Sequence, residues 1–154
     1  ERSGLYHITG TERIEAAVST IEELVSYGAK VLILAHQGSA GSQDCISLRP
    51  HKEVLEDLLD KKVIFQDNHI YGSSTTHIIQ EFMGTGTIFL LDNVRKLSDD
   101  GGDGRTPRSP EYFTSLPDSF TKVLGGIDTA DFFVNDAFSA SHRWQGSIIG
   151  FPSK

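Results

Sequence analysis

The sequence predicts an α/β domain with a mainly parallel sheet and helices on both faces. Two patterns predict this fold: amphipathic stretches at helical spacing alternate with short apolar runs, and those runs are apolar at consecutive positions. Consecutive apolar residues are typical of strands covered on both faces. Because the 154 residues suit one domain, we expect a single Rossmann-like three-layer sandwich.

The expected elements follow one another in alternation along the chain. Strands are predicted at residues 31–35, 63–65, 87–91 and 132–134, and helices at residues 11–27, from about 47 to 59, at 73–82 and at 117–124. Gly28 is suited to end the first helix, and Ser47 is the expected N-cap of the second, with Pro50 in its first turn. Residues 98–110 are dense in Gly, Asp, Pro and Ser, which predicts a surface loop.

Composition narrows the range of functions. The net charge of −7 argues against a general role on nucleic acid or anionic membrane, since both need a positive surface. Cys45 is the one cysteine, which excludes an internal disulfide and favours a reducing, cytoplasmic setting. No apolar run approaches the ~20 residues of a membrane span, and no signal peptide is expected. The histidines show no close metal-ligand pairing, so we expect no metal site in this chain.

Polar residues follow every predicted strand. Ligands of such sheets bind beyond the carboxyl ends of the strands, so these residues are expected to lie together. They are His36-Gln37-Gly38-Ser39, Asp67-Asn68, Asp92-Asn93-Val94-Arg95, and Asn135-Asp136 followed by Ser141-His142-Arg143. Arginine matches carboxylate and phosphate oxygens with its planar fork. The residues therefore predict a pocket for a small, multiply charged anion. Structural roles remain open, since a lone histidine, a surface arginine or a turn-capping Asn-Asp pair is common.

Several nucleotide and hydrolase motifs are missing. No Gly-Lys-Ser or Gly-Lys-Thr of a phosphate loop occurs, and no Gly-x-Ser-x-Gly occurs. Gly84-Thr85-Gly86 precedes a predicted strand instead of joining a strand to a helix, which disfavours a dinucleotide fingerprint. A generic Rossmann-like nucleotide binder therefore fits the sheet but lacks the glycine loop.

The chain resembles the phosphoglycerate kinases over nearly its whole length. Residues 11–16 (Thr-Glu-Arg-Ile-Glu-Ala) and 28–38 resemble the first substrate-side helix, strand and basic loop of that family. Residues 90–95 (Leu-Leu-Asp-Asn-Val-Arg) resemble its Leu-Leu-Glu-Asn-Val-Arg. The segments 133–138, 141–143 and 150–152 give the best match. Gln37 after His36, with Ser47-Leu48 further on, resembles the archaeal branch.

The resemblance implies the 3-phosphoglycerate-binding N-terminal domain over residues 1–154, incomplete at its start and without the nucleotide-binding C-terminal domain. The family transfers a phosphoryl group between 1,3-bisphosphoglycerate and ADP, giving 3-phosphoglycerate and ATP, in glycolysis and gluconeogenesis. By resemblance Arg13 is the catalytic candidate, helping to stabilise the charge of the transferring group. The implied substrate-binding residues are Arg13, His36, Gln37, Gly38, Ser39, Arg95, His142 and Arg143. Mg²⁺ with ATP or ADP is implied for the C-terminal half. The chain is expected to be a monomer and inactive alone.

Two departures from the family pattern leave a second function open. The family loop continues from His-x-Gly into Arg-Pro, whereas this chain continues into Ser39-Ala40. The family also has an Asp and an Asn on a strand before the first helix, and residues 1–10 contain no such strand pattern. The alternative is a degenerate, non-catalytic paralogue that binds anions or a partner.

Overall fold

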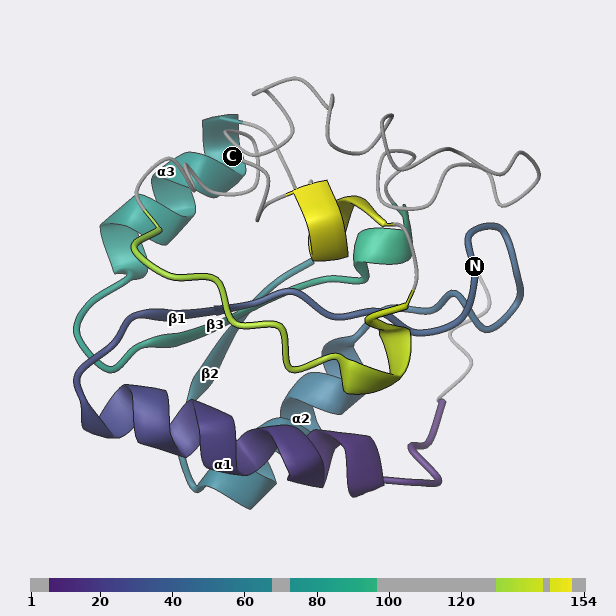
Figure 1. The fold of residues 1–154 in the computed structure, drawn as a ribbon, viewed down its shortest axis with the longest axis horizontal. Helices are drawn as coiled ribbons and strands as arrows, with labels where there is room; N and C mark the ends of the chain where they lie inside the picture. The colour runs from purple at the N-terminus through teal and green to yellow at the C-terminus, as the bar shows by residue number, and fades with distance from the viewer. Residues whose placement is uncertain (1–5, 68–72, 97–129, 143–144, 151–154) are drawn as a thin grey trace.

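The computed structural model of this chain describes residues 6–67, 73–96, 130–142 and 145–150 (Figure 1). The predicted loop at 98–110, the predicted helix at 117–124, and the residues Asn68 and Arg143 lie outside these ranges. In the part that is described, no helix is long and apolar enough to cross a membrane.

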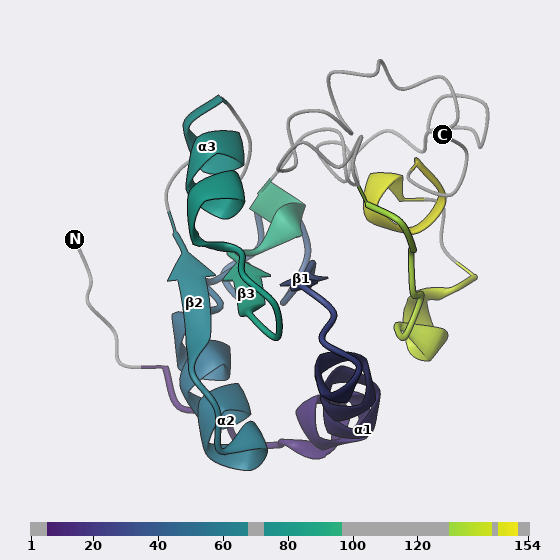
Figure 2. The same cartoon turned by 90° about the vertical axis from the view of Figure 1, so that its left-hand side faces the viewer.

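The sheet contains three parallel strands with the most apolar strand in the middle. β1 spans Val31–Ile33, β2 spans Val63–Gln66 and β3 spans Ile88–Leu91, in the order β1-β3-β2. Figure 2 shows β3 between β2 and β1. In register, Phe89 of β3 pairs with Leu32 of β1 and with Ile64 of β2. All four residues of β3 are buried, which is why this strand is apolar at every position. The parallel α/β architecture that the sequence predicted is confirmed.

Helices cover both faces of the sheet. α1 (Glu12–Ser26) and α2 (Arg49–Leu59) lie below the strands in Figure 1, and α3 (Ser73–Phe82) lies above them. One core cluster joins the two lower helices to the sheet through Ile21, Leu48, Leu55, Leu59, Val63, Ile88 and Leu90. The neighbouring Phe89 is 0% exposed. Burial of each such side chain contributes about 1.5–3 kcal/mol relative to exposure.

The ends of the first two helices depend on local chemistry in different ways. Gly28 has φ +77° and its N–H donates to the carbonyl of Val25 at 2.9 Å, so α1 ends where the sequence predicted. The expected N-cap of α2 was wrong by one residue, because Leu48 occupies that position without a side-chain cap. The Ser47 hydroxyl does accept from the Arg49 N–H at 3.3 Å, and it also donates to Asp92 at 3.0 Å.

The predicted fourth strand at residues 132–134 is wrong. These residues have no strand structure, and Phe132, Phe133 and Val134 are 88%, 42% and 52% exposed. A strand needs a neighbour to complete its ladder of hydrogen bonds, and the structure describes no strand pairing for this segment. The segment leads into a short 3-10 helix, η3 (Phe138–Ala140), and a further short helix, η4, spans Gly146–Gly150.

Candidate functional site

The carboxyl ends of all three strands meet and are hydrogen-bonded to one another. The N–H of Asp92, directly after β3, donates to the carbonyl of Gln66 at the end of β2 at 2.9 Å. Two residues later, the N–H of Val94 donates to the carbonyl of Ala35, just after β1, at 3.1 Å. These two bonds bring the chain after β3 to the ends of both neighbouring strands, where ligands of such sheets bind.

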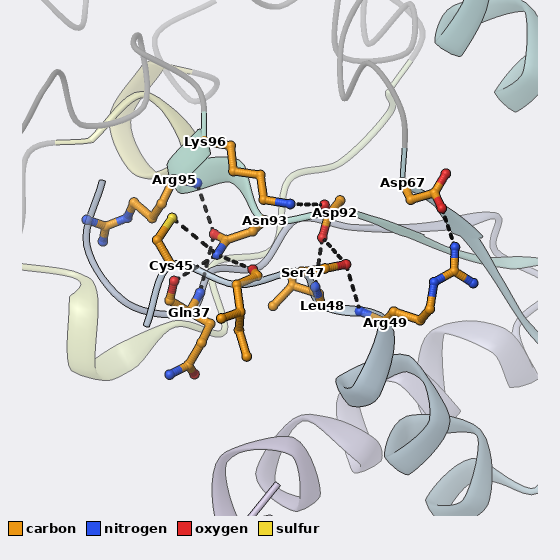
Figure 3. Close-up of polar contacts among 11 residues, drawn as sticks. Gln37, Cys45, Ser47, Leu48, Arg49, Asp67, Asp92, Asn93, Arg95 and Lys96 are labelled. Carbon is orange, nitrogen blue, oxygen red and sulfur yellow. Dashed lines mark hydrogen bonds and ion pairs between the residues drawn. The ribbon is translucent and has the colours of Figure 1, made fainter. Parts of the chain in front are cut away.

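Asn93 is at the centre of this edge and is 0% exposed. Its Nδ2 donates to the carbonyl of Gln37 at 2.7 Å and to that of Ile46 at 2.8 Å. Its Oδ1 accepts from the N–H of Gln37 at 3.3 Å and from the N–H of Arg95 at 3.1 Å. One amide thus joins the loop after β1, the segment before α2 and the turn after β3 (Figure 3). We call Gln37, Ile46, Asp92, Asn93 and Arg95 the strand-end cluster.

Asp92 supplies the negative charge of the strand-end cluster and is 1% exposed. Its Oδ1 accepts from the Leu48 N–H at 2.7 Å and from the Ser47 hydroxyl at 3.0 Å. Its Oδ2 pairs with the ammonium of Lys96. Because the Leu48 N–H lies at the start of α2, the carboxylate stabilises the positive end of that helix from a distant part of the chain.

The loop after β1 is held close to the chain that follows it. Gly38 has φ +71°, and a Cβ at this position would lie 2.5 Å from the main-chain carbonyl atoms of Asp44. Ser39 begins a turn in which its N–H donates to the Ser42 hydroxyl at 3.0 Å. Glycine is therefore required at residue 38 both by backbone conformation and by close packing.

The predicted binding residues are placed unequally around this edge. Arg95, in the 3-10 helix η1 (Val94–Lys96), is 6% exposed, so its charge lies inside the edge, where screening by water is weaker. Figure 3 shows the side chains of Arg95 and Lys96 leaving η1 in opposite directions, with Lys96 directed at Asp92. His36, Gln37 and Gly38 are half-buried and Ser39 is exposed. The structure thus brings Arg95 and the loop at residues 36–39 together through Asn93.

The remaining predicted residues lie further out or outside the description. Arg13 is exposed in the first turn of α1, which begins on the right of Figure 1, the same side as the ends of β1 and β3. His142 is exposed, directly after Ser141 of the short segment following η3. Arg143 lies outside the described residues. Within the described residues, no hydrogen bond or ion pair joins Arg13 or His142 to the strand-end cluster.

Burial and charge act on the one histidine of α2. His51 is half-buried, and its Nδ1 is buried without a hydrogen-bond partner among the described residues. Burial lowers the pKa of His51 below its usual 6.5, while the carboxylate of Asp92 acts in the opposite direction. Asp92 therefore acts on Lys96, on the start of α2 and on His51.

Sequence reasoning did not single out Asn93 and Asp92 as the residues that organise the site. Both were recognised as strand-end residues, but their partners lie 44 to 56 residues earlier in the chain. The available signal was an amide and a carboxylate directly after a fully apolar strand. Among the described residues, no group of three His, Cys, Asp or Glu side chains is arranged to hold a metal ion.

A family model described as phosphoglycerate kinase matches residues 3–154. The phosphoglycerate kinase of Haloarcula marismortui is 35% identical over 147 residues, which cover 94% of this chain and 34% of that protein. The enzyme of Methanococcus maripaludis is 38% identical over 140 residues, covering 90% of this chain and 33% of that protein. The chain therefore spans about a third of the length of the curated relatives that it matches.

Solved structures give the same result. The crystal structure of phosphoglycerate kinase from Pyrococcus horikoshii matches with a TM-score of 0.77 at 32% identity, covering 94% of this chain and 33% of that one. The phosphoglycerate kinase structure from Coxiella burnetii matches with a TM-score of 0.66 at 26% identity, covering 98% of this chain and 33% of the other.

Proposed function

This chain belongs to the phosphoglycerate kinase family, and from that premise we propose that it is the part of such an enzyme that binds 3-phosphoglycerate. The proposed reaction of the longer enzyme moves a phosphoryl group from the acyl phosphate of 1,3-bisphosphoglycerate to ADP. The products are 3-phosphoglycerate, with a carboxylate where the acyl phosphate was, and ATP. The reverse reaction uses that carboxylate as the acceptor.

The observation that carries this proposal is the connection between Arg95 and the loop at residues 36–39 through Asn93. A guanidinium and a histidine-containing loop lie at one sheet edge, beyond the carboxyl ends of parallel strands. This is the position where such sheets bind ligands. Phosphate and carboxylate oxygens are the groups that arginine pairs with best.

Within the proposed site each residue has a distinct task. Arg95 and His36 hold the phosphate and carboxylate end of the substrate, together with Gln37, Gly38 and Ser39 of the same loop. By the family resemblance, His142 and Arg143 are assigned to the same end. Arg13, at the start of α1, stabilises the charge on the transferring phosphoryl group. Phosphoryl transfer is catalysed mainly by positioning and by charge neutralisation, which is why cations and main-chain donors suffice on this side.

The nucleotide is proposed to bind elsewhere in the longer enzyme. The matched relatives are about three times as long as this chain, which covers 34% of the Haloarcula marismortui protein. Mg²⁺ bound with ATP or ADP supplies charge neutralisation on the phosphates during the transfer. We therefore expect the 154-residue chain alone to bind 3-phosphoglycerate without turning over ATP.

A degenerate, non-catalytic anion-binding protein is the second candidate, and Ser39 favours it. The resembling family has arginine at this position, whereas here a short, exposed hydroxyl stands there. Loss of one charged hydrogen bond costs about 1.5–3 kcal/mol. Ser39 therefore lowers affinity by one to two decades if no other residue compensates.

A calorimetric titration with 3-phosphoglycerate at low salt tests the proposal. Saturable binding is expected, and Arg95→Gln and Arg143→Ala should each weaken it by roughly ten- to a hundredfold, the effect of one charged hydrogen bond. Arg49→Gln is the matched control, because Arg49 is also an arginine near a strand end but pairs with Asp67 and covers the ring of Phe65. Folded chain that does not bind, or equal losses in all three variants, would contradict the proposal.

A further inference from the structure

The side chain of Asn93 is hydrogen-bonded at both of its polar atoms. Nδ2 donates to the carbonyls of Gln37 and Ile46 and also contacts the Cys45 Sγ, a weak acceptor, at 3.7 Å, and Oδ1 accepts from the N–H groups of Gln37 and Arg95. Asn93 is 0% exposed, so bulk water cannot reach its amide to replace a lost hydrogen-bond partner. Only asparagine and glutamine carry such an amide, with two donors and two acceptor positions, and asparagine holds it on the shorter side chain.

The partners of Asn93 come from both sides of the proposed anion site. Gln37 directly follows His36, and its N–H and C=O are both bound, which fixes the plane of its two peptide groups. The N–H of Arg95 fixes the start of the turn from which the guanidinium leaves (Figure 3). Ile46 lies at the far end of the loop that Gly38 packs against. Asn93 therefore connects the histidine loop to the arginine turn directly.

We propose that Asn93 is a positioning residue for the anion site: it holds the His36 loop at the separation from Arg95 that lets both contact one substrate molecule. This inference rests on the proposed function, since it names what fixes the geometry of that same site. Asn93 need not touch the substrate. Its effect is on the affinity of the folded protein, which a residue needed only for folding would leave unchanged.

The two other sets of bonds described at this edge have different partners. The Val94 N–H to Ala35 carbonyl bond, at 3.1 Å, extends the β1–β3 ladder and leaves residues 36–39 to be held separately. Asp92 is bonded to Ser47, Leu48 and Lys96, none of which belongs to the histidine loop. The bonds of Asn93, by contrast, join that loop to the Arg95 turn.

Asn93→Asp is the test variant, because it changes one nitrogen to oxygen and makes the effect depend on pH. When ionised, the new carboxylate keeps the two acceptor positions but faces the carbonyls of Gln37 and Ile46, which repel it. When protonated, the carboxyl group can donate to one of them again. Burial and the two carbonyls disfavour ionisation, so protonation is expected at moderately acidic pH. Leu55→Ala, in the core cluster on α2, is the control for loss of stability alone.

Affinity for 3-phosphoglycerate is measured by calorimetry at about pH 8 and about pH 5.5, with wild type at each pH as the reference, so that ionisation of the ligand cancels. At the higher pH Asn93→Asp should bind roughly tenfold more weakly than wild type, about the effect of one charged hydrogen bond. At the lower pH the difference in affinity between Asn93→Asp and wild type should become smaller. Leu55→Ala should keep wild-type affinity at both. Asn93→Ser, which retains one hydroxyl donor, is the second variant if Asn93→Asp does not fold.

Amide NMR signals of Gln37 and Arg95 separate this inference from the proposed function. In Asn93→Asp at the higher pH both signals should shift and hydrogen exchange at residues 37–39 should accelerate, and Leu55→Ala should show neither change. If wild type does not bind 3-phosphoglycerate, the proposed function fails, and these signals still decide whether Asn93 places the loop. Wild-type affinity in folded Asn93→Asp at the higher pH, or unmoved signals, would overturn the inference.

Discussion

The end of β3 and the segment at residues 130–142 carry similar sequences and have opposite structures. In the first, two leucines precede Asp92 and Asn93, and in the second Phe133 and Val134 precede Asn135 and Asp136. Asp92 and Asn93 are buried and bonded to distant segments, whereas Asn135 and Asp136 are exposed. Asn135 bonds only locally among the contacts described, through its Oδ1 to the Ala137 N–H at 3.1 Å.

The difference teaches that an apolar run becomes a strand through its neighbours. β3 is hydrogen-bonded to β1 on one edge and to β2 on the other, and both faces are covered. The run at 132–134 has comparable β-propensity and no strand beside it in the described structure. The polar residues after β3 are buried and bonded to distant segments because that strand is held on both of its edges.

The difference between β3 and residues 132–134 can be tested by truncating one phenylalanine in each, and this test has the largest expected effect. Phe89→Ala removes a ring that is 0% exposed and should cost about 3–5 kcal/mol of unfolding free energy, because a cavity remains. Phe132→Ala removes a ring that is 88% exposed and should change stability by less than about 0.5 kcal/mol. Urea denaturation followed by circular dichroism measures both. A cost above about 1 kcal/mol for Phe132→Ala would mean that residues 132–134 pack against something in solution.

Two glycines of the loop after β1 allow the same comparison, between a closely packed position and an open one, within a few residues of each other. Gly38 and Gly41 have φ of +71° and +76°, so alanine at either position costs about 1–2 kcal/mol of backbone strain. A Cβ at Gly38 would also lie 2.5 Å from main-chain atoms of Asp44, whereas one at Gly41 would meet nothing within 4 Å. Gly38→Ala should therefore cost about 1–3 kcal/mol more than Gly41→Ala.

Denaturant midpoints of the two glycine variants give this difference directly. Equal losses would show that the loop moves away from Asp44 without cost, and that residues 36–39 are not held at the strand ends. A larger loss for Gly38→Ala, together with weaker binding of 3-phosphoglycerate, would tie the position of the loop to the proposed site.

Much of the fold could be predicted because its signals are local. Four consecutive apolar residues predicted β3, and Gly28 predicted the end of α1, since each follows from the sequence within a few positions. The start of α2 was predicted one residue too early. Its first N–H groups are satisfied partly by Asp92, whose bond to Leu48 spans 44 residues, and no local pattern contains that information.

The candidate site also has one feature that the sequence predicted and another that depends on distant contacts. That polar residues would meet at the strand ends followed from the parallel topology, and the structure confirms this for the segments after β1 and β3, where Gln37 bonds to Asn93. That Asn93 connects them could not be predicted, because its partners Gln37 and Ile46 lie 56 and 47 residues away. The fourth strand was predicted from its apolar residues alone, without knowledge of which neighbour it would pair with.

The smallest expected effect is on the pH dependence of stability, and it compares His51 of α2 with His142 of the segment at residues 130–142. Burial lowers the pKa of His51 in the folded chain, so the unfolded chain binds the proton more tightly. The stability linked to His51 is therefore fully present above about pH 6.5, the ordinary histidine value, and is lost as pH falls through the lowered pKa. His51→Gln should remove this loss and flatten the dependence of unfolding free energy on pH below about 6.5. Urea titrations at a series of pH values measure it.

His142→Gln is the matched control, because His142 lies in the open segment and is exposed. Substitution of an exposed side chain changes stability little, so the variant should follow the wild-type stability curve through the same pH range. The nearby carboxylate of Asp92 opposes the effect of burial on His51. If His51→Gln made stability fall more steeply with acid, Asp92 would outweigh burial, and the strand-end cluster would act on α2 mainly through its charge.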